Sequence, residues 1–195
     1  MAYLNLAAIR PCTEAEGPGK RFAIWCQGCL RRCPGCCNPH MQPMIRRNLV
    51  EVKNLFELIK KHIELDAIEG VSFIGGEPLL QAEGFAELAQ LCQEVNLSVL
   101  LFTGYSYEDI SSADDDNIKK LLSCTDLLVD GEFVETLLDS ERDWIGSTNQ
   151  RVIFLSERYK KGVEYNHGYR TTEMRISANR ILINGWPSID LKYRD

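Results

Sequence analysis

Short apolar runs alternate with amphipathic segments along most of the chain. Five runs have the length and composition of buried strands: Phe22–Cys26, Val71–Ile74, Ser98–Phe102, Leu127–Val129 and Arg151–Leu155. Between them, apolar residues recur every three or four positions, which is the spacing of one helix face. This spacing predicts three helices, around Val52–Ile63, Phe85–Cys92 and Ile118–Leu122. A weak capping box formed by Ser106 and Asp109 predicts the start of another helix.

Strands that alternate with helices at this spacing predict βαβ units and a mostly parallel sheet. The chain has 195 residues, whereas a full barrel of eight units takes about 250. We therefore expect an α/β fold, an open and partial (βα) barrel, over residues 1–155. Residues 156–195 form a C-terminal extension packed on the same domain, in which Glu173–Ala178 and Arg180–Asn184 predict a short β-hairpin.

Polar or cysteine-bearing loops follow four of the predicted strands. They are Cys29–Cys36, Gly75–Pro78, Thr103-Gly104 and Asp130-Gly131. The carboxyl ends of parallel strands meet at one edge of a sheet, and ligands bind outside that edge. We therefore expect the four loops to lie together and to form the functional site.

The first of these loops carries three cysteines at the spacing Cys29-x-x-x-Cys33-x-x-Cys36. Thiolates are the ligands of iron–sulfur clusters, and three of them leave one iron of a four-iron cubane open to another ligand. A zinc site that includes Cys26 is an alternative, but two Cys-x-x-Cys pairs this close together hardly surround a tetrahedral ion. Four cysteines within residues 26–36 are too dense to be only core residues. Cys26 itself shares a strand face with Phe22 and is expected in the core.

Composition and charge exclude several other classes of protein. Hydrophobic residues make up 45% of the chain and charged residues 26%, as in ordinary globular proteins. A net charge of −6 gives no support to nucleic-acid binding, and we interpret Arg31-Arg32 as solvated surface. No apolar stretch approaches the ~18 residues needed to span a membrane, and the first residues lack the pattern of a signal peptide. We expect a cytoplasmic protein whose clustered cysteines stay reduced and bind metal.

The cysteine loop resembles that of the radical S-adenosylmethionine superfamily, which has cysteines at this spacing. Within the superfamily the chain is most similar to the activating enzymes, in particular the activators of anaerobic ribonucleotide reductase. Three segments carry this resemblance: Gly17-Pro18-Gly19, Gln27-Gly28-Cys29 and Cys33-Pro34-Gly35-Cys36. It covers roughly residues 1–155, and it implies a [4Fe-4S] cluster on Cys29, Cys33 and Cys36 with S-adenosylmethionine at the open iron.

The resemblance also implies the reaction. A flavodoxin- or ferredoxin-type donor supplies one electron, S-adenosylmethionine is cleaved, and a 5′-deoxyadenosyl radical takes a hydrogen atom from a glycine of a partner glycyl radical enzyme. One alternative is a radical enzyme that modifies a peptide or a small molecule, with residues 156–195 shaping its pocket. Another is a non-catalytic iron–sulfur or zinc module, which needs neither an open iron nor the run Gly75–Pro78.

Gly75, Gly76, Glu77 and Pro78 are the second group of candidate site residues. Glycines let a backbone approach a ligand closely, and free carbonyls accept from an ammonium group. The resemblance implies that this run holds the amino group of S-adenosylmethionine, with Glu77 orienting the loop. Taken alone, the run fits a tight strand–helix turn equally well.

The remaining candidates are assigned to the cofactor by resemblance, although each alone fits a turn or loop. Thr103 and Asp130 line the ribose or sulfonium side, or the approach of the target backbone. Ser147 and Asn149 belong to a segment, Gly146–Arg151, similar to one in the activators. The last two, Gly35 and Cys37, flank the third cysteine, where the family commonly carries an aromatic residue near the adenine. No side chain is singled out as an acid, base or nucleophile.

Overall fold

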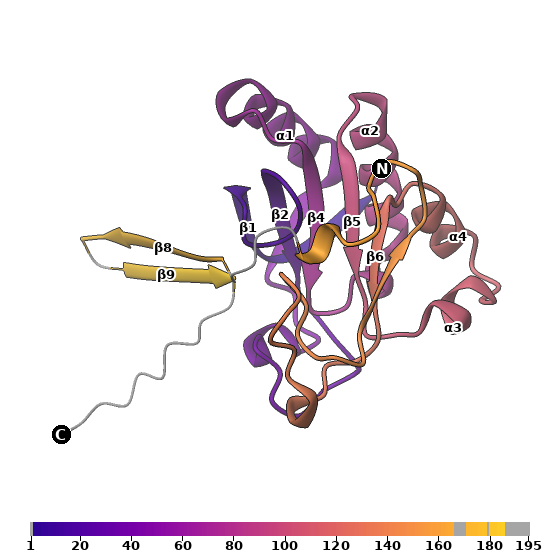
Figure 1. Ribbon diagram of the computed structural model, residues 1–195. Helices are drawn as coiled ribbons and strands as arrows, with labels where there is room; N and C mark the ends of the chain where they lie inside the picture. Colours follow the sequence, from indigo (N-terminus) through magenta and orange to yellow (C-terminus); the bar gives the residue numbers. More distant parts are fainter. Residues whose placement is uncertain (1, 166–170, 179, 186–195) are drawn as a thin grey trace.

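The computed structural model of the protein describes residues 2–165, 171–178 and 180–185. Its main body is an open seven-stranded sheet with the strand order β3-β1-β2-β4-β5-β6-β7 (Figure 1). The strands are β1 (Tyr3–Thr13), β2 (Arg21–Cys26), β3 (Asn48–Glu51), β4 (Gly70–Gly75), β5 (Ser98–Phe102), β6 (Leu127–Asp130) and β7 (Arg151–Phe154). Four central neighbours, β2, β4, β5 and β6, run parallel, while β1, β3 and β7 are antiparallel to theirs. The predicted α/β fold with an open, mostly parallel central sheet is confirmed.

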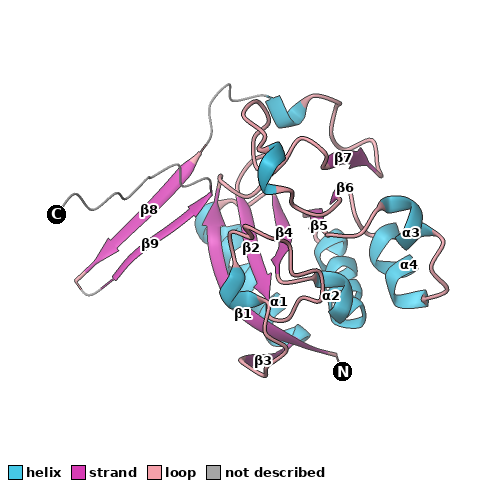
Figure 2. Cartoon of the chain, turned by 90° about the horizontal axis from the view of Figure 1, so that it is seen from below, coloured by secondary structure: helices cyan, strands magenta, loops and turns pink. Residues whose placement is uncertain are grey.

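Helices cover one face of the sheet and loops cover the other (Figure 2). The α-helices are α1 (Val52–Asp66), α2 (Ala82–Glu94), α3 (Tyr107–Ser111) and α4 (Asp116–Ser123), with 3-10 turns η1 (Pro39–Met41), η2 (Pro78–Gln81), η3 (Glu135–Leu137) and η4 (Val163–Tyr165). Leu55 of α1, Phe85 of α2 and Leu121 of α4 pack with strand residues in the main core. On the opposite face, Met41 covers Trp25, and Ile145 packs on Leu100. This loop-covered face therefore carries the segments that follow β2 and β6.

The predicted elements are confirmed to within a few residues. Ser98–Phe102 is a strand with the predicted bounds, and Ser106 caps α3 by accepting a hydrogen bond from the Asp109 backbone nitrogen (3.2 Å). Strands β1 and β3 were not predicted from the apolar pattern, because β1 is mostly half-buried and β3 is a short edge strand with no buried residue. None of the helices in the described part of the chain has the length and apolar character needed to cross a membrane.

The predicted C-terminal hairpin is also confirmed. Strands β8 (Thr172–Ser177) and β9 (Arg180–Gly185) form a separate antiparallel two-stranded sheet that projects from the side of the body (Figure 1). The division of the chain at residue 155 stays a prediction. Residues 166–170, 179 and 186–195 of the predicted extension lie outside the described residues.

A fully buried arginine connects the beginnings of three parallel strands. Arg21, the first residue of β2, donates from Nε to Ser72 Oγ (2.7 Å) and from Nη1 to Ser98 Oγ (2.9 Å) and Tyr159 Oη (3.1 Å). Its Nη2 also donates to the Val71 carbonyl. Among the described residues no carboxylate forms an ion pair with Arg21, so neutral oxygens satisfy its donors. This network fixes the strand ends opposite the cysteine loop.

We expect the Arg21→Ala substitution to lower the free energy of unfolding by about 3 kcal/mol, because several buried acceptors lose their donor at once. The measurement is urea unfolding followed by circular dichroism. Arg21→Lys keeps the charge with fewer donors, so it should fall between the wild type and the alanine variant. The matched control is Arg46→Ala at an exposed position, which should change the stability by less than about 0.5 kcal/mol. Equal effects of Arg21→Ala and Arg46→Ala would contradict this role.

Candidate functional site

The loops that carry the candidate residues follow parallel strands whose ends lie in register. Cys26 at the end of β2 pairs with Gly75 of β4, and Phe102 at the end of β5 pairs with Val129 of β6. The four loops therefore leave the sheet at the same edge, which we call the rim. It comprises residues 27–47, 76–81, 103–106 and 131–150. The structure thus places the sequence-predicted site residues on neighbouring loops.

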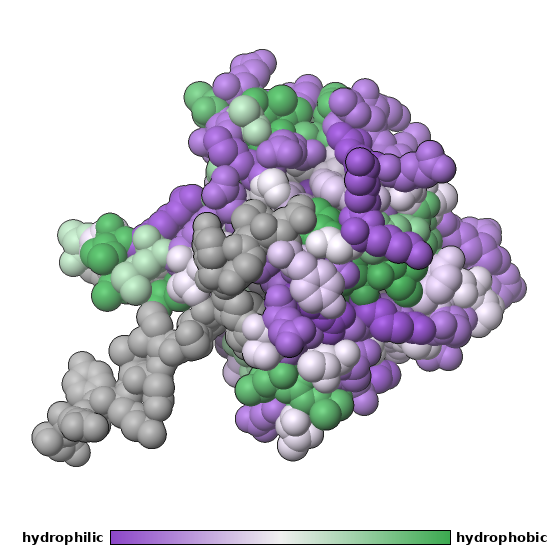
Figure 3. Space-filling view, in the orientation of Figure 1, coloured by the Kyte–Doolittle hydropathy of each residue, from purple (hydrophilic) through white to green (hydrophobic). Residues whose placement is uncertain are grey.

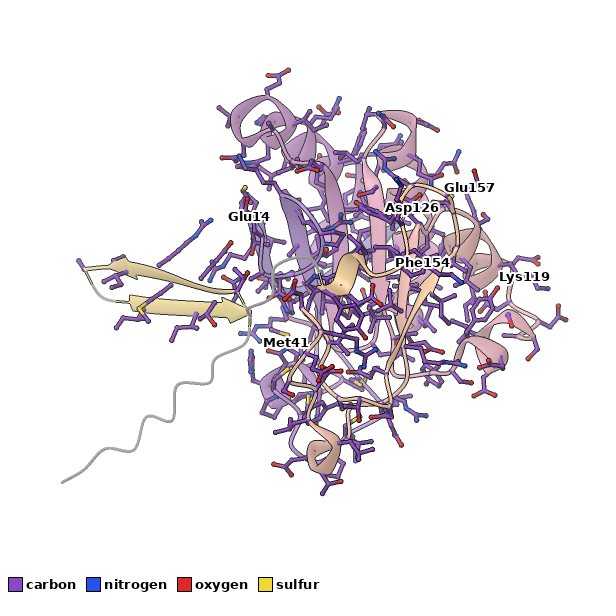
Figure 4. All side chains as sticks on the ribbon, viewed as in Figure 1. Glu14, Met41, Lys119, Asp126, Phe154 and Glu157 are labelled. Carbon is purple, nitrogen blue, oxygen red and sulfur yellow. The ribbon has the colours of Figure 1, made fainter. Side chains whose placement is uncertain are left out.

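The cysteine loop is anchored at its base by backbone hydrogen bonds. Gly28 donates to the Met41 carbonyl (2.8 Å), and Cys29 donates to the Gln42 carbonyl (3.0 Å). Met41, labelled in Figure 4, is buried against the sheet and holds this returning segment in place. Residues 30–40 therefore form a closed loop that extends from a fixed base and carries Cys33 and Cys36.

The three candidate ligands are half-buried free thiols. Burial raises the pKa of Cys33, a hydrogen bond from the Phe133 backbone lowers it, and the neighbouring thiols of Cys29 and Cys36 raise it further. All three thiols lie within residues 29–36 of one loop. In the described ranges, however, no group of three or more His, Cys, Asp or Glu side chains is already arranged as a metal site. A donor set of three thiols on one loop fits an iron–sulfur cluster that takes a further ligand from outside the chain.

The other two cysteines near the loop differ from these three. Cys26 is fully buried among core residues, which confirms its expected packing role. Cys37 is exposed, although it directly follows Cys36. Gly35 has a positive φ of 70°, and a Cβ there would lie 2.6 Å from the carboxylate carbon of Glu135. The turn before the third cysteine therefore requires a glycine.

The run Gly75–Pro78 lies directly against the base of the cysteine loop. Gly76 donates to the Cys26 carbonyl (2.9 Å), and Glu77 donates to the Gly28 carbonyl (2.8 Å). A Cβ on Gly76 would lie 2.2 Å from the Gly28 oxygen, and Gly75 has a positive φ of 105°. Both positions therefore need glycine, because any side chain would force the two loops apart. The geometry requires close backbone approach at this point, as the sequence predicted.

Glu77 connects this glycine loop to the next loop on the rim. Its side chain is buried; Oε1 accepts from the Leu79 nitrogen (3.1 Å) and from Thr103 Oγ1 (2.9 Å), and Oε2 accepts from the Gly104 nitrogen (2.9 Å). Burial raises the pKa of Glu77, and these hydrogen bonds act in the opposite direction. Since protein donors occupy both oxygens, Glu77 orients the loops, and the Thr103 hydroxyl serves the same connection.

Asp130 is held by a different set of partners. Its buried carboxylate accepts from the Tyr107 nitrogen (2.7 Å) and from Arg151 Nε (3.0 Å), and it forms an ion pair with the Arg151 guanidinium. Arg151 also binds Glu108 through two hydrogen bonds of 2.9 and 2.6 Å, which lower the pKa of Glu108 to about 2. The structure thus connects Asp130 to the beginning of α3 and to β7.

Ser147 and Asn149 bind the loop that follows β6. Ser147 is buried, and its Oγ accepts from the Val134 nitrogen (3.1 Å), while Asn149 Nδ2 donates to the Glu132 carbonyl (2.9 Å). Gln150 adds a bond from Nε2 to the Gly131 carbonyl (3.0 Å). The segment that contains these residues therefore shapes residues 131–134, which in turn contact the cysteine loop.

Arg31 is a rim residue that the sequence analysis misjudged as solvated surface. Its side chain is 32% exposed, and its guanidinium lies 4.9 Å from the centre of the Tyr105 ring and pairs with Glu132 (3.0 Å). Gly104 leaves room for it, because a Cβ there would lie 2.9 Å from Arg31 Cγ. Arg32, by contrast, is exposed as expected. The sequence did contain one indication that Arg31 belongs to the site, because it lies between the candidate ligands Cys29 and Cys33. Its partners could not be predicted, because they lie far away in the sequence.

Comparison with known proteins gives a family for this arrangement. Residues 15–153 match the family of 4Fe-4S single cluster domains. The chain is 30% identical over 154 residues to the anaerobic ribonucleoside-triphosphate reductase-activating protein of Enterobacteria phage T4, covering 76% of this chain and 93% of the relative. It is 28% identical over 163 residues to the protein of the same name from Escherichia coli K12, with coverages of 78% and 99%.

A pyruvate formate-lyase-activating enzyme from Clostridium pasteurianum is 32% identical over 135 residues, which cover 66% of this chain and 52% of that enzyme. The region of 15–153 includes all four rim loops and the three half-buried thiols. The family match and the structure therefore place the candidate site in the same part of the molecule. The chain belongs to the family of 4Fe-4S single cluster domains.

Proposed function

We propose that this protein is a radical S-adenosylmethionine enzyme that activates a glycyl radical enzyme. We propose that this partner is an anaerobic ribonucleotide reductase. Cys29, Cys33 and Cys36 hold its [4Fe-4S] cluster. The observation that carries the proposal is the placement of these three thiols on a loop whose base is bonded to Gly76 and Glu77. The names of the relatives, which are activating proteins and enzymes, support the same activity.

When bound, the cluster and S-adenosylmethionine together supply a 5′-deoxyadenosyl radical that takes a hydrogen atom from a glycine of the partner. The protein supplies position and shelter, because such a radical attacks any nearby carbon–hydrogen bond. The cysteine thiolates bind iron, and Gly75 and Gly76 bring bare backbone to the base of the cysteine loop. Glu77 and Pro78 fix that backbone, since the Glu77 carboxylate is fully bonded and Pro78 begins η2.

The other candidate residues divide into two groups by their contacts. Gly35 and Cys37 lie exposed on the cysteine loop, where they are free to face the adenine side of the cofactor. Thr103, Asp130, Ser147 and Asn149 each have a polar side-chain atom that is already bonded to another part of the protein. We propose that this second group positions the loops around the cofactor, and their direct contact with it stays a prediction.

The proposal includes an electron donor of the flavodoxin or ferredoxin type and a cytoplasmic location. Both follow from the resemblance and from the need for reduced cysteines. A pocket-shaping role for the extension, which would favour a small-molecule substrate, has less support. In the described part of the chain, hydrogen bonds join the hairpin to residues 10–16, at the far end of β1 and just beyond it.

Iron content tests the assignment of the ligands. Anaerobically reconstituted protein should hold about four irons per chain, and Cys33→Ala should lose them because two thiols no longer retain the cluster. Cys37→Ala is the matched control, since Cys37 is exposed and is not one of the three cysteines of the Cys29-x-x-x-Cys33-x-x-Cys36 spacing. Iron and sulfide analysis with absorption spectroscopy measures both variants. Loss of iron in Cys37→Ala together with retention in Cys33→Ala would contradict the assignment.

The connecting role of Glu77 predicts a change in cofactor binding. Glu77→Gln removes one acceptor and presents an amide to the Gly104 nitrogen, so the glycine loop should shift while the cluster stays bound. We expect the Kd for S-adenosylmethionine to rise about tenfold, as for the loss of one charge-assisted hydrogen bond. The Kd is measured from the change in the electron paramagnetic resonance of the reduced cluster. Glu83→Gln, on the exposed side of α2, is the control and should bind normally.

Mixing with the partner tests the proposed reaction itself. Protein loaded with iron, reduced by dithionite and supplied with S-adenosylmethionine should release 5′-deoxyadenosine. With the anaerobic reductase of the same organism it should also produce a glycyl radical resonance. A glycine-to-alanine variant of the reductase is the control and should give no signal. Cleavage without the resonance would favour a peptide or small-molecule substrate, and absence of cleavage would favour a binding module.

A further inference from the structure

The C-terminal hairpin carries an exposed apolar face. In the antiparallel register Met174 pairs with Ile183, and Ile176 pairs with Ile181. Residues two apart on a strand share a face, so these four side chains form one surface, which we call the hairpin apolar face. Their exposed fractions are 48% for Met174, 73% for Ile176, 61% for Ile181 and 36% for Ile183. Figure 3 shows this apolar surface on the projecting hairpin.

The hairpin is attached to the body through polar contacts at its base. Asn184 Nδ2 donates to Thr13 Oγ1 (2.9 Å), Gly185 donates to Glu16 Oε1 (3.0 Å), and Glu173 Oε1 accepts from the Glu14 nitrogen (2.8 Å). Figure 4 labels Glu14 at this end of β1. The apolar face is therefore not used to pack the hairpin on the described body. A lone two-stranded sheet is marginally stable in water, so a partner that covers this face would stabilise the hairpin.

The hairpin also lies outside the region that carries the shared chemistry. The family match ends at residue 153, before β8 begins at Thr172. The two activating proteins are matched over 93% and 99% of their own length, yet they cover only 76% and 78% of this chain. The hairpin therefore lies outside the part of the chain that matches the family model.

The size of the face argues against a second copy of this chain as its sole occupant. Four partly exposed side chains offer roughly a few hundred Å², whereas a stable interface buries about 800 Å² on each partner. The face is too small to hold a second copy of this chain by itself. It is large enough to strengthen an interface that exists elsewhere, because a second contact on the same partner gains from high effective concentration.

We propose that the hairpin apolar face is an accessory docking site for the glycyl radical enzyme, which meets it with an exposed apolar patch away from its radical-bearing glycine. This inference rests on the proposed function, which already brings that enzyme to the rim. The hairpin base contacts Thr13, opposite Arg21 at the start of β2, and it also contacts Glu16. A partner of domain size that contacts the rim can also reach the hairpin, and Figure 2 shows the hairpin extending sideways past the body.

The test is the double variant Ile176→Glu/Ile181→Glu, which places two charges at paired positions of the face. The concentration of glycyl radical enzyme that gives half-maximal radical formation should rise about tenfold, as for the loss of apolar anchors. Dithionite-driven cleavage of S-adenosylmethionine without the partner should be unchanged, and saturating partner should restore the full radical yield. Ile176→Thr, which keeps the strand propensity, should give a smaller rise in the same direction.

The matched control is Leu65→Glu, because Leu65 is 75% exposed on α1 and lies outside the hairpin. It should leave the half-maximal concentration unchanged. If the wild type forms no glycyl radical at any partner concentration, the proposed function fails. If the wild type is active and the double variant matches it, only the docking proposal is overturned.

Two other occupants would give distinct results. A dimeric wild type that becomes monomeric in the double variant, with an unchanged half-maximal concentration, would assign the face to a second copy and overturn the proposal. Alternatively, a truncation after Gly185 and the double variant would lower the unfolding temperature equally, again with unchanged partner dependence. That result would assign the face to the last residues of this chain and would also overturn the proposal.

Discussion

The backbone contact between the loops that follow β2 and β4 is the constraint on which the rest of the site depends. Glu77 donates to the Gly28 carbonyl and Gly76 donates to the Cys26 carbonyl, at 2.8 and 2.9 Å. This approach exists only because Gly76 has no side chain, since a Cβ would lie 2.2 Å from the Gly28 oxygen. The contact sets where the cysteine loop leaves the sheet, and it also sets how far the three thiols lie from the glycine run.

Buried polar groups also fix neighbouring strands and loops at both ends of the parallel strands. On the rim, the Glu77 carboxylate joins the loop after β4 to Thr103 and Gly104, and Arg31 joins the cysteine loop to Glu132. At the opposite end, Arg21 joins the beginnings of β2, β4 and β5. Buried networks of this kind are costly when one member is missing, so they specify one arrangement of the strands. A rim fixed in this way suits a reaction in which the protein mainly holds the reacting groups in position and contributes little side-chain chemistry.

The central strands and the order of the rim loops could be predicted from the sequence because their signals are local. The runs at Phe22–Cys26 and Ser98–Phe102 are short and apolar, and glycine or polar residues follow them. Each run therefore predicts a buried strand and the position where it ends. The connections between loops gave no comparable signal. Arg21 binds residues 51 and 77 positions away, and Arg31 binds a residue 101 positions away, which no window of sequence can show. Half-buried β1 and the edge strand β3 were missed because their residues face water on one side.

The radical reaction and the recognition of a partner require different features of this fold. The structure places these features in separate parts, the rim and the hairpin. A radical attacks indiscriminately, so the rim must be rigid and its residues are coupled to one another through shared hydrogen bonds. Recognition of one partner requires only a complementary surface, which can be joined to the domain without moving the rim. The hairpin meets this requirement, because its polar base contacts Thr13 and Glu16 near the start of β2, whereas Cys29 follows the end of that strand. Substitutions on its apolar face can therefore change partner affinity independently of the site that performs the reaction.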